Sequence, residues 1–102
     1  METLQWLYPE NRIQYTYDME NYCRTASGHR IVRKEDRKGI HYQLFLTDRT
    51  SWEMIKTALN GIGSFISYGD SSVHFYGGNY IYINGRDAFK AVKELLGVEI
   101  KW

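Results

Sequence analysis

The chain repeats its own pattern in its second half, and this internal duplication constrains the fold more than any other feature of the sequence. A shift of 37 positions places the apolar run 44–46 on the run 81–83 and aligns Arg49 with Arg86. Each copy contains an apolar strand pattern, a polar break and an amphipathic helix pattern. Because self-similarity at a fixed spacing is typical of repeated supersecondary units, we expect two halves that share one architecture.

Both halves predict the same order of elements, which is strand, strand, helix, strand. We assign residues 29–68 to the first unit and residues 72–102 to the second. Apolar alternation and turn residues predict an α+β fold, in which an antiparallel-rich sheet of about six strands carries two helices on one face. The strands are expected over these segments: residues 29–34, 40–47, 62–68, 72–76, 79–83 and 98–102.

Polar residues and glycines mark the ends of the two expected helices. Thr50 and Glu53 form a capping-box pattern at the start of the first helix. Gly61 is expected to end that helix in the left-handed conformation. Asn84 is expected to cap the second helix, and Gly97 to end it.

Composition indicates a single globular domain over residues 1–102. The chain is 43% hydrophobic with a single proline, as expected for a chain that builds a core. Residues 1–28 have the least regular pattern, and we interpret them as an N-terminal extension that packs on the sheet. The single Cys23 excludes an intramolecular disulfide and is typical of a reducing compartment. Since no signal-peptide or membrane-spanning pattern is seen, we expect a cytoplasmic protein without membrane contacts.

Strand alternation predicts one face of the sheet that is unusually rich in aromatic residues. If the helices cover the face of Leu44, Phe75 and Ile81, the opposite face has no helix of its own. Three explanations stay open for that face. Residues 1–28 could cover it, a protein partner or a second copy of the chain could bind it, or nucleic-acid bases could stack on it. The residues concerned are His41, Phe45, His74, Tyr76, Tyr80 and Tyr82.

A basic segment is expected to form a hairpin with its turn at residues 35–39. The net charge of the chain is only +1, so any attraction for nucleic acid must come from a local cluster of cations. A projecting basic hairpin can place cations on phosphates. The other interpretation is a solvated turn that Glu35 and Asp36 partly neutralise. The basic residues are Arg24, Arg30, Arg33, Lys34, Arg37 and Lys38.

Patterns for catalysis, metal binding or cofactor binding are not found in the sequence. Cys23 and the three histidines lack the spacing of metal ligands or of a nucleophile with its base. We therefore expect no enzymatic activity, no metal and no cofactor. Arg49 and Arg86 each precede an expected helix at the same place in the repeat, so an anion could bind there together with helix N-terminal amides. A solvated arginine is the alternative interpretation.

The duplicated strand–helix layout, the two hairpins and the basic turn resemble the double-wing DNA-binding domain of a bacteriophage middle-promoter transcription activator. The resemblance covers residues 39–66 and 78–92, roughly half of the chain, and lies in the layout rather than in a shared motif. In that family a saddle-shaped six-stranded sheet contacts DNA and two helices back the sheet. The resemblance thus implies DNA binding by the exposed sheet face and the hairpins, and suits a phage or mobile-element accessory protein.

We therefore expect a small accessory or regulatory protein that binds DNA or RNA through the basic hairpin and the aromatic sheet face. The alternative is an inhibitor or adaptor that blocks a host factor through the same face. Whether the chain forms a homodimer stays open at this point.

Overall fold

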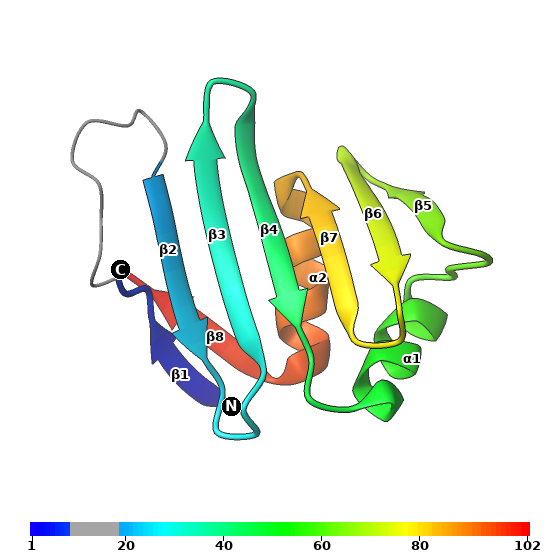
Figure 1. Ribbon diagram of the computed structural model, residues 1–102, viewed down its shortest axis with the longest axis horizontal. Coiled ribbons are helices and arrows are strands. Elements are labelled where there is room, and N and C mark those ends of the chain that lie inside the picture. The colour runs from blue at the N-terminus through cyan, green and yellow to red at the C-terminus, as the bar shows by residue number, and fades with distance from the viewer. Residues whose placement is uncertain (9–18) are drawn as a thin grey trace.

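The computed structural model describes residues 1–8 and 19–102, which form an α+β fold (Figure 1). A six-stranded antiparallel sheet has the strand order β2-β3-β4-β7-β6-β5. The predicted fold class is confirmed. The strands of this sheet are β2 (Met19–Arg24), β3 (Arg30–Asp36), β4 (Gly39–Phe45), β5 (Phe65–Tyr68), β6 (Ser71–Tyr76) and β7 (Tyr80–Asn84).

One face of the large sheet is covered by a second layer. This layer contains helix α1 (Arg49–Ala58), helix α2 (Arg86–Leu96) and a two-stranded parallel sheet of β1 (Glu2–Gln5) and β8 (Val98–Lys101). Figure 1 shows all of these elements on the same side of the large sheet. No helix in the described part of the chain is long and apolar enough to cross a membrane.

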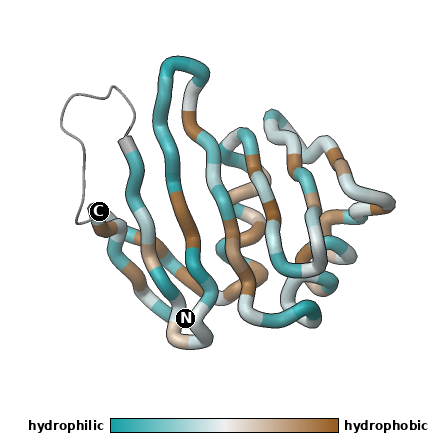
Figure 2. Tube along the Cα trace, in the orientation of Figure 1, coloured by the Kyte–Doolittle hydropathy of each residue, from teal (hydrophilic) through white to brown (hydrophobic). Residues whose placement is uncertain are grey.

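The core lies between the two layers and follows the alternation predicted from sequence. Leu44, Ile81 and Ile83 are completely buried on the covered face of the sheet, opposite Ile55 and Val92 of the helices. Each aliphatic side chain of this size contributes about 1.5–3 kcal/mol when it is fully buried. Figure 2 shows the hydrophobic residues in the middle of the sheet, whereas the β3–β4 turn is hydrophilic.

The two halves keep the predicted order of elements but place their last strands differently. Strand β5 pairs with β6 at one edge of the large sheet. Strand β8 leaves that sheet and pairs in parallel with β1, so that Glu2 faces Val98. The sixth strand of the large sheet is instead β2, which pairs with β3. The structure therefore does not confirm that the halves are equivalent.

Asp48 caps the first helix, so the predicted capping box is wrong. Its carboxylate accepts hydrogen bonds from the Ser51 amide at 2.5 Å and from the Ser51 hydroxyl at 3.0 Å. These two bonds hold the pKa of Asp48 below its usual value. Glu53 instead pairs with Arg49 at 2.9 Å, one turn away along the helix. Asp48 occupies the N-cap position, so its charged carboxylate, rather than the Thr50 hydroxyl, accepts the hydrogen bonds at the start of α1.

Of the three other predicted helix ends, the one at Gly97 is confirmed, and those at Gly61 and Asn84 are wrong. Asn60, not Gly61, adopts the left-handed conformation after α1, with a φ of 60°. Gly97 ends α2 with a φ of 69°, as expected. Asn84 does not cap α2, because Gly85 occupies the cap position without a side-chain bond. The hydroxyl of Ser71 in β6 accepts from the Ala88 amide instead, at 3.1 Å, so a neighbouring strand completes this helix start.

Candidate nucleic-acid interface

The open face of the large sheet carries all six aromatic residues that the sequence assigned to it. The register places Phe45 opposite Tyr80, and Tyr80 opposite Tyr76 on its other side. His74 lies opposite Tyr82 in the same way. Because alternate side chains of a strand point to the same face, these rings share one surface across β4, β7 and β6. We call this surface the aromatic face: His41, Phe45, Phe65, His74, Tyr76, Tyr80 and Tyr82.

The rings of the aromatic face form a continuous row across four strands. Neighbouring ring centroids are 5.1 Å apart for Phe45 and Tyr80, 5.7 Å for Tyr80 and Tyr76, and 6.0 Å for Tyr76 and His74. Phe65 of β5 continues the row at 4.9 Å from His74. Three of these contacts have interplanar angles of 8–23°, so the row is a stacked arrangement of the kind that aromatic pairs favour.

A shallow hollow of about 500 Å³ lies in the middle of the aromatic face, between His74, Tyr76, Tyr80 and Tyr82. Tyr76 is 49% exposed. Burial raises the pKa of Tyr82, and Tyr80 and Asp36 act in the same direction, so the phenol is uncharged at neutral pH. The hollow is thus an apolar, ring-walled surface of the size of a small-molecule site.

The described part of the N-terminal extension does not cover this hollow. Strand β1 and Trp6 lie in the helix layer, where Trp6 packs on Phe89 with ring centroids 6.1 Å apart, and Leu7 pairs with Tyr22 at the outer edge of β2. Residues 19–24 form β2 at the far edge of the sheet, with four strands between it and β5. The remaining aromatic residues of the extension, Tyr15 and Tyr17, lie outside the described residues.

Strand alternation divides the predicted basic residues between the two faces. Lys34 shares the open face with His41, its neighbour in register, and Arg30 shares it with Phe45. The guanidinium of Arg30 lies 5.7 Å from the ring centroid of Phe45 and 6.0 Å from that of Tyr22, so it extends the row of rings as a cation–π partner. Arg24 lies opposite Arg30 in register and belongs to the same face. Arg33 points to the covered face, opposite Tyr42 in register.

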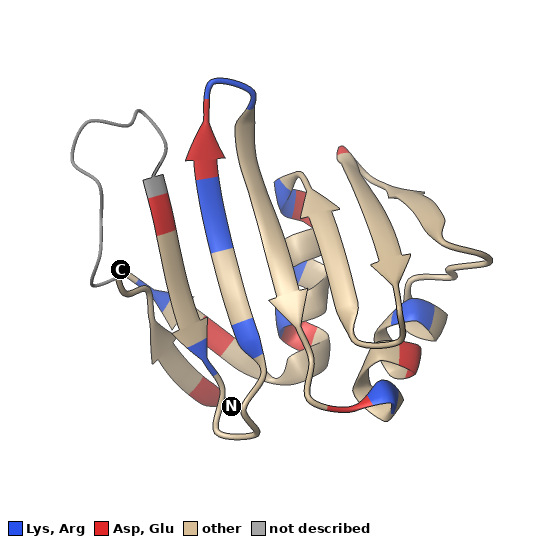
Figure 3. Ribbon diagram, viewed as in Figure 1, with Lys and Arg blue, Asp and Glu red and all other residues tan. Residues whose placement is uncertain are grey.

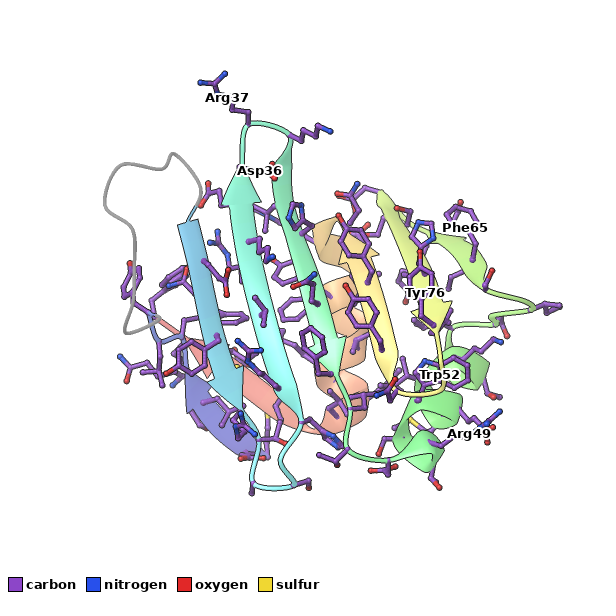
Figure 4. All side chains as sticks on the ribbon, viewed as in Figure 1. Asp36, Arg37, Arg49, Trp52, Phe65 and Tyr76 are labelled. Atoms are coloured by element: carbon purple, nitrogen blue, oxygen red, sulfur yellow. The ribbon has the colours of Figure 1, made fainter. Side chains whose placement is uncertain are left out.

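The basic hairpin is longer than predicted and ends in a two-residue turn. Strand β3 continues to Asp36, and Arg37 and Lys38 form the tip. The Asp36 carboxylate accepts from the Lys38 amide at 2.8 Å and lies 3.7 Å from the His41 Nε2. Figure 3 shows Lys and Arg concentrated along β3 and its turn, and Figure 4 shows Arg37 projecting from the tip. The hairpin therefore places two cations beyond the edge of the aromatic face.

The two arginines of the predicted anion site start equivalent helices but lie in different surroundings. Arg49 is the first residue of α1 and Arg86 the first residue of α2. Arg49 is 74% exposed, pairs with Glu53 and lies against the β6–β7 turn. Arg86 lines a cavity on the covered side of the sheet. The two arginines therefore lie at different places on the molecule.

Two residues of the open face, Phe65 and Tyr22, could not be assigned from the sequence. Phe65 joins the aromatic face only because β5 pairs with β6 in the register that sets it opposite His74. Tyr22 joins the open face through the pairing of β2 with β3. Neither β2 nor β5 has a clear alternation of apolar and polar residues. Only their pairing with neighbouring strands therefore shows on which face of the sheet each side chain lies.

The described residues contain no group of three or more His, Cys, Asp or Glu side chains that could hold a metal ion. Cys23 is buried, and burial together with the nearby Glu2 carboxylate raises the pKa of its thiol to about 11. Its thiolate is therefore a minor species at neutral pH. Comparisons of the chain with protein-family models, with curated proteins and with solved structures found no match.

Proposed function

We propose that the aromatic face binds single-stranded nucleic acid. The observation that carries this proposal is the row of rings from Phe45 to Phe65 across an open sheet, in which three of the four neighbouring pairs are stacked, with a ring-walled hollow of about 500 Å³ at its centre. Base stacking on an aromatic side chain is worth about 1–3 kcal/mol per base and tolerates any base, since every base has a π face.

Charge supports the same assignment. The cations of the open face, Arg30 and Lys34, lie beside the rings on β3, and Arg37 and Lys38 extend past them at the hairpin tip. A strand whose bases stack on the rings would hold its phosphates within reach of these cations. Electrostatic contacts with phosphates supply most of the sequence-independent affinity of such proteins.

Single strands fit this face better than duplexes do. In a duplex each base is stacked between its neighbours, and only base edges reach the grooves. The rings of Tyr76 and Tyr80 offer surfaces for flat contacts rather than hydrogen bonds to base edges. The proposal therefore differs from the duplex binding that the double-wing resemblance implies, although both use the same face of the sheet.

Replacing Arg37 and Lys38 with alanine should weaken the salt dependence of binding without abolishing it. Each phosphate contact on a single strand contributes about 0.7 to the slope of log K against log salt, so the slope should fall by roughly 1.4. The measurement is fluorescence anisotropy of a labelled oligothymidine of about twelve nucleotides, titrated at several salt concentrations.

The matched control replaces Lys90 and Lys101, two exposed cations of the other layer, and should leave the slope unchanged. The wild-type protein should also bind the single strand more tightly than a duplex of the same length. Equal or tighter duplex binding would contradict the proposal. Absence of binding to any DNA or RNA oligonucleotide would overturn it in favour of the protein-binding inhibitor or adaptor.

A further inference from the structure

A second cavity, of about 390 Å³, lies on the covered side of the large sheet, between β3, β4, α2 and β8. Its position separates it from the aromatic face, since Tyr42 lines the cavity while its neighbours His41 and Gln43 point to the open side. The volume falls within the range of sites for small molecules. A ligand in this cavity would therefore be distinct from a nucleic-acid strand bound to the aromatic face.

Aromatic rings from three distant parts of the chain form one wall of the cavity. Tyr42 and Phe89 stack with ring centroids 3.7 Å apart and an interplanar angle of 1°. Trp6 packs on Phe89, and its ring centroid lies 6.4 Å from that of Trp102. Trp6 is only 8% exposed, whereas Trp102 is 62% exposed. The wall thus contains one buried indole, that of Trp6, and one exposed indole, that of Trp102.

Four basic side chains line the same cavity, against one acidic side chain. Arg86, Lys90 and Lys93 come from successive turns of α2, and Arg33 comes from β3. Asp87, the only acid among the described residues of the lining, accepts a hydrogen bond from the Asp70 amide at 3.2 Å. The described lining residues therefore carry more positive than negative charge.

Arg33 is mostly buried and is incompletely paired among the described residues. Its side chain is 12% exposed, and its Nη2 donates to Glu35 at 3.3 Å. Its Nη1 is buried without a hydrogen-bond partner among the described residues, as are both amide atoms of Asn21, its neighbour in register on β2. Buried polar atoms without partners are rare in proteins. Arg33 lines the cavity, so its unpaired Nη1 indicates that the cavity accepts a ligand with hydrogen-bond acceptors and negative charge.

The guanidinium of Arg33 also lies 4.9 Å from the ring centroid of Trp102, which joins the charged and aromatic parts of the cavity. We propose that this cavity binds a small anionic ligand that carries a flat ring, with a nucleoside monophosphate as the chemical class. The ring contacts the indoles of Trp6 and Trp102, and the phosphate contacts Arg33, Arg86 and Lys93. This site lies beyond the proposed single-strand interface and does not depend on it.

Isothermal titration calorimetry with AMP, adenosine and inorganic phosphate tests the proposal. AMP should bind at least about tenfold more tightly than either fragment, because only AMP combines a ring with a charged group, and tenfold corresponds to about 1.4 kcal/mol. Adenosine or phosphate binding as tightly as AMP would overturn the assignment, as would the absence of AMP binding at millimolar concentration.

Two variants locate the AMP site. Replacing both Arg86 and Lys93 with alanine should lower AMP affinity by at least about tenfold, since both side chains contact the phosphate and hydrogen bonds between charged groups are stronger than neutral ones. Arg49→Ala is the matched control, because Arg49 occupies the same helix position as Arg86 outside the cavity, and it should bind AMP like the wild type. Circular dichroism checks that each variant is folded, and glutamine at both positions serves if the alanine variant is not.

The aromatic face must also be excluded as the AMP site. A Tyr76→Ala/Tyr80→Ala variant should bind AMP with unchanged affinity, because both rings lie on the other side of the sheet. Loss of AMP binding in this variant, or an equal loss in Arg49→Ala and in the Arg86/Lys93 variant, would overturn the proposal.

Discussion

Replacing Tyr76 and Tyr80 together with alanine is expected to reduce the affinity for single-stranded oligonucleotides by about thirtyfold or more. Two stacking contacts are worth about 2 kcal/mol at the lower limit of about 1 kcal/mol per base, and about 1.4 kcal/mol corresponds to a tenfold change in affinity. Both rings line the central hollow and lie 5.7 Å apart, so the variant removes the middle of the row. Anisotropy titration of the same oligothymidine measures the loss.

Matched variants separate stacking from other effects of the substitution. The Tyr76→Phe/Tyr80→Phe variant keeps both rings and should keep most of the affinity, although Tyr80 loses its hydrogen bond from Gln43. Tyr68→Ala removes a tyrosine of the same sheet from the other face and should have little effect. If the phenylalanine variant loses as much affinity as the alanine variant, the hydroxyl groups rather than the rings bind the strand, and the stacking account is wrong.

Replacing Gly85 with alanine is expected to lower the free energy of unfolding by about 2–6 kcal/mol. Gly85 has a φ of 116° and a ψ of 162°, a conformation that costs a residue with a side chain about 1–3 kcal/mol. A Cβ atom at this position would also lie 2.5 Å from the Ser71 hydroxyl oxygen and 2.8 Å from the Ser71 Cα. Relieving such overpacking typically costs a further 1–3 kcal/mol or so. Urea denaturation measures the change.

The contact with Ser71 makes this substitution more damaging than an ordinary glycine replacement. Moving Ser71 would disturb its hydrogen bond from the Ala88 amide, which completes the start of α2. Gly63→Ala is the control, because Gly63 also has a positive φ of 82° but has no atom within 4 Å of an added Cβ. It should cost about 1–2 kcal/mol. Equal costs at the two positions would show that the close approach to Ser71 does not contribute.

Local patterns were sufficient to predict much of the fold. The β6–β7 hairpin at Gly77 and Gly78, the apolar face of Leu44 and Ile81, and the end of α2 at Gly97 all depend on neighbouring residues. Such features follow from turn chemistry and from the period of a strand or helix. The composition of the open face followed from the same alternation.

Features that depend on distant segments could not be predicted in this way. The pairing of β1 with β8 joins the two ends of the described chain, and the alternation of Val98 and Ile100 is compatible with any sheet. The cap of α2 comes from Ser71 on another strand. The cavity beside α2 requires Trp6 and Trp102 to meet. These contacts are set by tertiary packing rather than by local propensity.

The placement of Arg33 and Lys34 on opposite faces of the sheet could be predicted only in part. Successive residues of a strand point to opposite faces, so the sequence contained the information. The prediction grouped both residues with Arg37 and Lys38 as one basic cluster around a turn at 35–39. Because β3 continues to Asp36, Arg33 belongs to the cavity on the covered side and Lys34 to the open face.

Side-chain NMR signals during titration with the oligothymidine would test most directly that single strands bind the aromatic face. The side-chain amide of Gln43 donates to the Tyr80 hydroxyl at 3.0 Å and reports on the open face. The indole N–H groups of Trp6 and Trp102 report on the opposite side of the sheet. We expect the Gln43 signals to shift in proportion to the bound fraction while both indole signals stay in place. Shifts confined to the indole signals, with Gln43 unaffected, would contradict the proposed binding face.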